Sequence, residues 1–216
     1  RLTDGMLEYE PLARYEDYIN IHIINLVSEE SGVDDAPDVM VDTALDAGNS
    51  FDEFHGRKAT RIDVPLANLE FSTSENFGMD PDIKIVILNG GGGGAYYGIA
   101  LIGPDVLTLV HEVGHTFARL ADEYDYPHKD YEGSYRATNV SDEPLGLPWS
   151  HWLGYDDPYT GVVSAFEGAG YHETGLFRPS AHSMMRGPAY FDPIGKEAFI
   201  HAIYEVVDPI DYHTAA

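Results

Sequence analysis

The 216-residue sequence contains no cysteine, few basic residues and no long apolar segment. Without cysteine it can form no disulfide, thiolate zinc site or cysteine nucleophile, so any bound metal must be held by His, Asp or Glu. Its 12 Lys and Arg face 37 Asp and Glu, which gives a formal charge of −25. This excess argues against nucleic acid as a partner, because affinity for phosphate backbones comes mainly from basic residues. No run approaches the roughly 20 apolar residues of a membrane-spanning helix, so we expect no membrane insertion.

Apolar and aromatic residues are plentiful enough to build a core. Hydrophobic residues make up 44% of the chain, which contains 15 Tyr, 9 Phe and 2 Trp. A disordered acidic tail would lack such a content of core-forming side chains. We therefore predict one folded domain over residues 1–216, the usual number of domains for this length.

Two segments of the first half carry strand signals. Residues 18–27 (YINIHIINLV) and 83–88 (IKIVIL) are rich in β-branched and apolar side chains, which is typical of strands. Asn89 and five glycines, Gly90–Gly94, follow the second segment. They lack the lysine and hydroxyl of a phosphate-binding loop. The segment is either a surface loop or, as we prefer, the rim of a cleft where a substrate backbone pairs as an added strand.

Two helices are predicted further along the chain. The first begins at Pro104, because proline is well tolerated at the first helical position. Its apolar residues recur at helical spacing and form one stripe: Val106, Leu109, Val110, Val113, Phe117 and Leu120. His111 and His115 lie on nearly the opposite side of this helix. The second helix is predicted after Pro193, where apolar residues again recur every three to four positions.

The residues His111-Glu112-Val113-Gly114-His115 form an H-E-x-x-H motif within the first predicted helix. Histidines four residues apart lie about 6 Å apart along a helix axis, so both imidazoles can reach one zinc ion. Glu112 stands beside such an ion without binding it. There it can act as general base and then general acid, taking a proton from a metal-activated water and passing it to the leaving amine.

A catalytic zinc site needs a third protein ligand and an open fourth position. In a straight helix Asp122 would lie about 10 Å further along the axis than His115, too far to share one ion. The helix must therefore end near Arg119 and the chain turn back if Asp122 is the third ligand. Three other residues compete for this role: Glu123, His128 and His182.

The sequence resembles the zinc peptidases typified by the clostridial immunoglobulin A peptidase. The resemblance rests on six segments: 15–20 (YEDYIN), 28–34 (SEESGVD), 111–124 (HEVGHTFARLADEY), 166–171 (FEGAGY), 176–179 (LFRP) and 183–186 (SMMR). The order of parts is also similar to the wider metzincin group. This resemblance implies an α/β, metzincin-like, two-lobed metallopeptidase domain. Such a domain has a mixed twisted sheet and a zinc-binding active-site helix in an upper lobe (about 1–124). A loop-rich lower lobe with a C-terminal helix follows (about 125–216).

The resemblance also assigns site residues. By comparison with metzincins, Asp122 is the third zinc ligand, and Met185, or less well Met184, supplies the methionine turn beneath the metal. Apart from this comparison, Tyr171 and Arg178 are candidate contacts to the oxyanion of the transition state or to a substrate carboxylate. The alternatives are a buried tyrosine and a salt-bridged arginine. One residue departs from the family pattern: Arg119 stands where a glycine is usual, and a left-handed arginine costs roughly 1 to 2 kcal/mol. Either the turn is made in another way, or the third ligand is not Asp122.

The resemblance implies a secreted or cell-surface bacterial zinc endopeptidase with one catalytic zinc. Its substrate would be a protein or peptide, and we expect a monomer. The surplus of carboxylates keeps structural calcium as a further option. Two other classes of function stay open: a non-catalytic adhesion or glycan-binding module that retains a peptidase fold, and a structural zinc domain with a closed four-ligand site.

Overall fold

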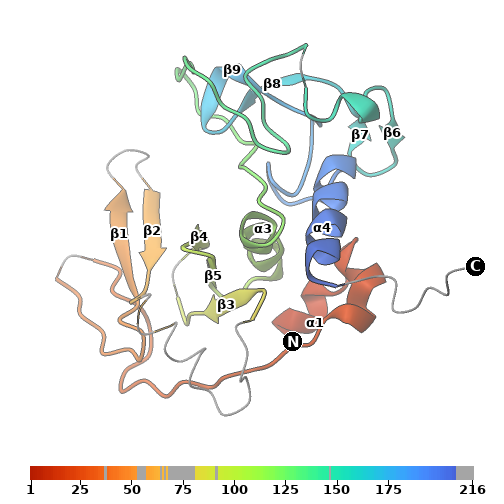
Figure 1. The fold of residues 1–216 in the computed structure, drawn as a ribbon. Coiled ribbons are helices and arrows are strands. Elements are labelled where there is room, and N and C mark those ends of the chain that lie inside the picture. The colour runs from red at the N-terminus through yellow and green to blue at the C-terminus, as the bar shows by residue number, and fades with distance from the viewer. Residues whose placement is uncertain are drawn as a thin grey trace, which may run out of the picture. The chain divides into compact units, whose positions relative to one another are not determined.

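The computed structural model describes residues 1–36, 38–52, 57–63, 65, 67, 81–90, 92–145 and 147–207 (Figure 1). The described chain is a mixed α/β structure with small sheets and few helices, which confirms the predicted mixed α/β class. It divides into two compact units. Unit 1 comprises Arg1–Met6 and Ile19–Thr116, and unit 2 comprises Leu7–Tyr18 and Phe117–Ala216.

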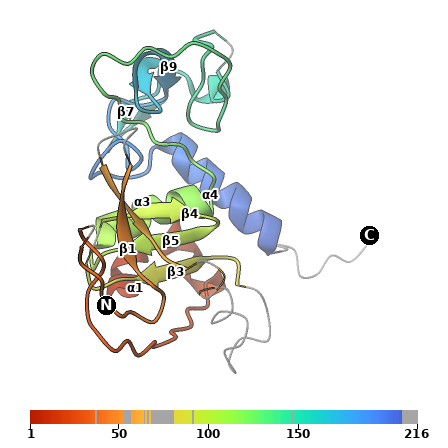
Figure 2. The same cartoon turned by 90° about the vertical axis from the view of Figure 1, so that its left-hand side faces the viewer.

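Unit 1 contains a three-stranded mixed sheet. Its order is β3 (Lys84–Ile87), β5 (Ile99–Ile102) and β4 (Gly94–Tyr96), with β5 in the centre (Figure 2). Strand β3 runs parallel to β5, whereas β4 runs antiparallel to it. All four residues of β5 are buried, as expected for an apolar central strand. The strand predicted over 83–88 is therefore confirmed, and β4 forms an edge of the sheet.

Helix α3 (Val106–Thr116) packs on β5 (Figure 1). At the start of this helix, the Asp105 carboxylate accepts a hydrogen bond from the backbone N–H of Thr108 at 2.7 Å. Its buried apolar residues confirm the predicted stripe within the helix: Leu109, Val110 and Val113. The helix ends at Thr116, so the predicted continuation of the stripe to Phe117 and Leu120 is wrong. The short α1 (Leu2–Met6) also contacts α3.

Two other described strands of unit 1, β1 (Gly48–Asp52) and β2 (Arg57–Arg61), form an antiparallel pair. The strand predicted over 18–27 is wrong, because that segment has no strand in the structure. Ile23 and Val27 in this segment are exposed. The propensity of β-branched residues for strands depends on a partner strand and a surface to pack against, which this segment does not find within the described residues.

Unit 2 is built from short strands and turns around two hairpins. Strands β8 (Phe166–Ala169) and β9 (His172–Arg178) form one antiparallel hairpin, and β6 (Asp156–Asp157) and β7 (Gly161–Val162) form the other. The 3₁₀ helices among its described residues are η1 (Leu12–Tyr18) and η2 (Ser150–Trp152). Val140, Ala169 and Leu176 form a buried cluster at the β8–β9 hairpin.

Helix α4 (Pro193–Val206) confirms the helix predicted after Pro193. Asp192 caps it by accepting the backbone N–H of Gly195 at 2.8 Å, a common way to satisfy a first-turn donor. The buried Phe199 ring packs against Phe117 and Phe191, with ring centroids 6.0 Å and 4.7 Å away. Among the described helices, none is long and apolar enough to cross a bilayer.

Candidate metal centre

His111 and His115 lie on successive turns of α3 with their rings close together. The two Nε2 atoms are 3.1 Å apart, and the rings are nearly perpendicular, with an interplanar angle of 86°. Both side chains are partly buried. The structure therefore brings the two histidines together as their four-residue spacing predicts.

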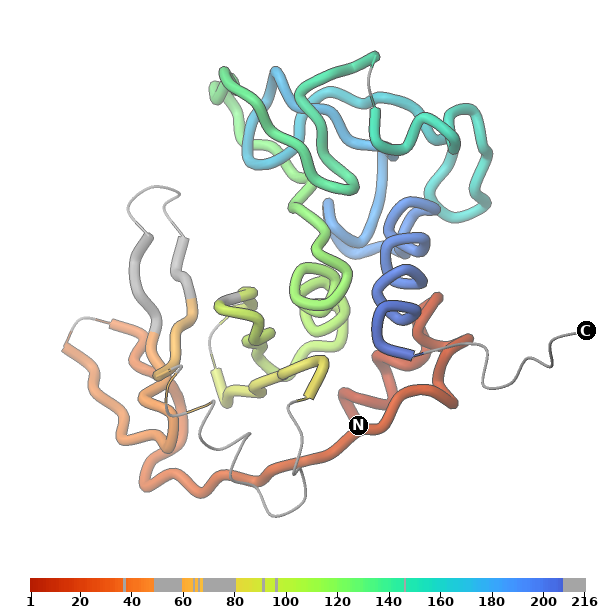
Figure 3. The backbone as a smooth tube through the Cα atoms, viewed as in Figure 1, coloured from red at the N-terminus to blue at the C-terminus, as the bar shows by residue number. Residues whose placement is uncertain are grey.

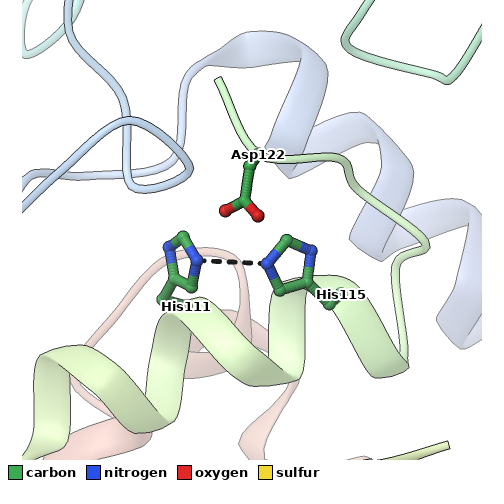
Figure 4. A group of neighbouring side chains, drawn as sticks. All are labelled: His111, His115 and Asp122. Carbon is green, nitrogen blue, oxygen red and sulfur yellow. Dashed lines mark hydrogen bonds between the residues drawn. The ribbon is translucent and has the colours of Figure 1, made fainter. Parts of the chain in front are cut away.

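Asp122 joins these histidines in one group of potential ligands. One ligand atom from each residue lies within 4.8 Å of the other two. Figure 4 shows the Asp122 carboxylate directed toward the gap between the two imidazole rings. Within the described ranges, no other group of three such residues meets this condition. Glu123, His128 and His182 lie outside it.

The three donors suit a transition metal such as zinc. Two nitrogens bound tetrahedrally to one zinc at about 2.0–2.1 Å lie about 3.3 Å from each other. The observed Nε2 separation of 3.1 Å is close to this value. Two imidazoles and one carboxylate also leave a fourth tetrahedral position for water or substrate, as in catalytic zinc sites. The donor set therefore fits the ion that the sequence predicts.

Asp122 reaches the histidines because the helix ends and the chain turns. The backbone leaves the helical path after α3 (Figure 3), and Arg119 takes a left-handed conformation with φ of 56°. The chain thus makes the left-handed turn without the usual glycine. The turn is therefore not made in another way, and the identity of the third ligand stays a prediction. Asp122 comes within reach of the histidines all the same.

A buried asparagine fixes the segment before Asp122. The Asn139 side chain accepts the backbone N–H of Ala121 and donates to the carbonyl of Ala121, both at 2.8 Å. It is fully buried, with an exposed fraction of 0%. Sequence reasoning missed this residue, because an isolated asparagine 17 or 18 positions downstream carries no local signal of such a contact.

Glu123 is buried in unit 2 and does not belong to the group of ligands. Its carboxylate accepts hydrogen bonds from Asn139 Nδ2 at 2.8 Å and from Ser183 Oγ. Burial, and next the nearby Asp192 carboxyl, raise the pKa of Glu123 to about 8. The structure therefore gives Glu123 a buried supporting position between two segments of unit 2.

The two competing histidines are both exposed. The backbone N–H of His128 donates to Glu173 at 2.6 Å, and His128 itself has a positive φ of 63°. His182 lies two residues before Met184 in the sequence. Neither imidazole belongs to the group formed by His111, His115 and Asp122.

Glu112 is buried on α3 between the two histidines, with an exposed fraction of 7%. The backbone of Gly93 lies directly against it: a β carbon at position 93 would be 2.7 Å from Glu112 Oε1 and 2.3 Å from Thr108 Cγ2. Real β carbons do not approach other atoms so closely. The glycine-rich segment therefore needs at least this one glycine to pass beside the predicted general base.

The segment 183–186, which contains Met184 and Met185, is hydrogen-bonded to the segment that carries Asp122. Met184 and Met185 are both buried, and the backbone N–H of Glu123 donates to the carbonyl of Met185 at 2.8 Å. Arg186 and Gly187 close a turn by donating to the carbonyl of Ser183 at 3.1 Å. The function of Met185 beneath a metal stays a prediction.

Tyr171 and Arg178 both have partners within unit 2. The Tyr171 hydroxyl donates a short hydrogen bond to Asp122 Oδ2. Burial, followed by the charge of Asp122, raises the pKa of Tyr171 above its ordinary range, so the hydroxyl remains a donor. The buried Arg178 donates to three backbone carbonyls: Ser180, Glu167 and Gly168. Arg178 therefore braces the β8–β9 hairpin.

Two imidazoles, a carboxylate and an intervening glutamate on a mixed α/β framework define a candidate metal-dependent hydrolase site. The family model for IgA peptidase M64 matches residues 1–158, and the chain belongs to this family. This confirms the resemblance found in the sequence. No curated protein matches the chain. Membership of a peptidase family identifies the chain as a protease by class, and its substrates as proteins or peptides.

Proposed function

We propose that this chain is a secreted bacterial zinc endopeptidase whose single catalytic zinc is held by His111, His115 and Asp122. The grouping of these three donors within 4.8 Å is the observation that carries the proposal. Bound there, zinc would supply a Lewis acid that makes water more acidic and polarises the scissile carbonyl.

Glu112 is the general base and then the general acid. It accepts a proton from the attacking water as the water oxygen bonds to the carbonyl carbon. It then donates this proton to the amide nitrogen as the carbon–nitrogen bond breaks. Its position between the two histidines and its burial support this function, since proton transfer needs a group held close to the reacting atoms.

The finer fold assignment is also a proposal. We infer a metzincin-like domain with an upper lobe over about 1–124, a lower lobe over about 125–216, and Met185 in the methionine turn. The hydrogen bond from Glu123 N–H to the Met185 carbonyl supports it, because this bond fixes the turn to the residue after Asp122. Strand β4, at the edge of its sheet, would pair with an extended substrate.

Other parts of the proposal rest on composition and family. Secretion and a monomeric state follow the resemblance, and the net charge of −25 suits a protein that stays soluble outside the cell. Structural calcium remains an option for the surplus carboxylates. For Tyr171 and Arg178, the bonds to Asp122 and to backbone carbonyls favour supporting functions over direct contact with the transition state.

The two alternatives make different predictions. An adhesion or glycan-binding module would cleave nothing in a metal-dependent way. A structural zinc domain would have a fourth protein ligand, whereas the group within the described residues contains three. The presence of Glu112 beside the two histidines favours catalysis.

The proposal is tested by Glu112→Gln. We expect the variant to keep its zinc, because Glu112 is not a ligand, and to lose casein cleavage by about 10²–10⁴-fold, the usual contribution of a proton-transfer group. Zinc is measured by elemental analysis and cleavage by a fluorogenic assay. The control is Glu132→Gln, an identical change at an exposed glutamate, which should leave both unchanged. Cleavage by Glu112→Gln at the wild-type rate would refute the proposal.

A further inference from the structure

The tip of the β8–β9 hairpin is fastened to the segment that carries Asp122. The backbone N–H of Gly170 donates to the carbonyl of Asp122 at 3.0 Å, and that of Tyr171 donates to the carbonyl of Tyr124 at 2.9 Å. The Tyr171 hydroxyl then donates to the Asp122 carboxylate itself. These hydrogen bonds join residues 170–171 to residues 122–124, all within unit 2.

Tyr171 adopts a conformation that aromatic residues rarely take. Its φ of 70° lies in the left-handed region, where a bulky side chain is an outlier. Such strain persists only where the surroundings fix it, and it gathers at functional sites. Here the ring lies nearly parallel to Tyr126, at 20° with centroids 5.9 Å apart, and meets Tyr124 edge-on at 5.1 Å. The hydroxyl therefore has a fixed position over Asp122.

A carboxylate that binds a metal through one oxygen can still rotate unless its other oxygen is held. Hydrogen bonds from a surrounding shell of residues orient metal ligands in this way, and their loss typically weakens metal binding about 10–100-fold. Asp122 is buried, with an exposed fraction of 8%, so bulk water has little access to replace a lost donor. Tyr171 supplies this donor from a side chain that packing already holds still.

We propose that Tyr171 is a positioning residue that orients the Asp122 carboxylate for metal binding. The inference rests on the metal centre of the proposed function, and it adds a residue that determines the affinity of this centre for zinc. Tyr171 lies beyond residues 1–158, which the family model matches, so the match itself assigns it nothing. It acts through Asp122 and not on the substrate.

The test compares zinc affinity in two tyrosine-to-phenylalanine variants, measured by competition with a chromophoric chelator. Tyr171→Phe should bind zinc about 10–100-fold more weakly than the wild type. The matched control, Tyr131→Phe, loses a 3.1 Å hydrogen bond from its hydroxyl to the carbonyl of Ser134 and should bind zinc as the wild type does. Thermal unfolding of the metal-free proteins is recorded in parallel, because a purely structural function would lower the Tm and leave the Kd for zinc unchanged.

A second variant, Tyr171→Asn, keeps the test decisive if Tyr171→Phe does not fold. Asparagine tolerates a positive φ but is too short to reach Asp122 from this turn, so we expect the same loss of affinity. Wild-type zinc affinity in the folded variant would overturn the inference while leaving the proposed function intact. If the wild type itself bound no zinc, the proposed metal centre would fail, and the inference with it.

Discussion

At the scale of single residues, Gly93 determines how closely the glycine-rich segment approaches α3. Its φ is not in the left-handed region, so conformational freedom is not the reason for glycine here. The reason is space, because a β carbon would lie 2.3 Å from Thr108 Cγ2 and 2.7 Å from Glu112 Oε1. Any larger residue must displace either the segment or the Glu112 carboxylate.

We therefore expect Gly93→Ala to lower kcat/KM for a peptide by about 10–100-fold, since small displacements of a catalytic group have effects of this size. Zinc content should stay at the wild-type level. Gly92→Ala is the control, because position 92 lies outside β4 and a β carbon there meets nothing within 4 Å. The value of kcat/KM is measured from steady-state hydrolysis of a fluorogenic peptide. Equal values for the two variants would show that Gly93 does not constrain Glu112.

At the scale of secondary-structure elements, the turn after α3 determines whether Asp122 faces the histidines. Arg119 takes the left-handed conformation at φ of 56°, which costs roughly 1 to 2 kcal/mol for a residue other than glycine. Its side chain contacts Glu205 at 3.4 Å, but both side chains are mostly exposed. Exposed ion pairs of this kind contribute little. The hydrogen bonds of Asn139 to Ala121 help to hold the turn in place.

Substitutions at Arg119 should change stability in opposite directions. Arg119→Gly relieves the strain but gives the unfolded chain more freedom, so we expect the free energy of unfolding to rise by up to about 1 kcal/mol. Arg119→Val should lower it by about 1–2 kcal/mol, because a β-branched residue tolerates this conformation poorly. Urea unfolding measures both, with Glu205→Gln as a control for the ion pair. A valine variant as stable as the wild type would contradict the turn described here.

A second link between elements joins the β6–β7 hairpin to α4. The Asp157 carboxylate accepts from Lys196 Nζ at 3.0 Å and from the backbone N–H groups of Tyr159 and Thr160 at 3.0 Å. Burial by itself would raise the pKa of Asp157, but these hydrogen bonds and the Lys196 charge outweigh it and lower the pKa. A carboxyl with a lowered pKa in the folded state stabilises the protein above its unfolded pKa. That contribution is lost as the pH falls through the folded value.

Acidification below about pH 4 should therefore remove the contribution of Asp157. We expect Asp157→Asn to lower the free energy of unfolding at neutral pH by about 1–3 kcal/mol. The variant should also lose less stability on acidification than the wild type. Urea unfolding between neutral and acidic pH provides the measurement. Asp156→Asn, at the exposed neighbouring position, is the control. Parallel pH profiles for the Asp157 variant and the wild type would refute this account.

At the scale of the whole molecule, the sequence predicts what local patterns determine. Helices α3 and α4 and strand β3 follow from apolar spacing. Pro193 marks the start of α4, whereas α3 begins at Val106, two residues after the predicted start at Pro104. The pair His111 and His115 follows from helical geometry. The strand predicted over 18–27 fails because strand formation needs a partner that a single segment does not reveal. Local sequence patterns predict single helices and strands but not which of them pair.

Contacts between distant segments complete the surroundings of Asp122, and these could not be predicted. Asn139, Tyr171 and Met185 all bond to residues 121–123, although they lie well downstream in the sequence. No spacing rule connects them to Asp122. The left-handed conformation of Arg119 could not be predicted either. Arginine disfavours this conformation, and only contacts in the folded chain hold it there.

The central claim is that one zinc ion, held by His111, His115 and Asp122, is required for peptide hydrolysis. The most direct measurement follows casein cleavage by the wild-type chain after removal of metal and during titration with zinc. We predict that cleavage is lost on removal and fully restored at one zinc per chain, because the structure offers one such group of donors within the described residues. Undiminished cleavage by protein that elemental analysis shows to be free of metal would contradict the account.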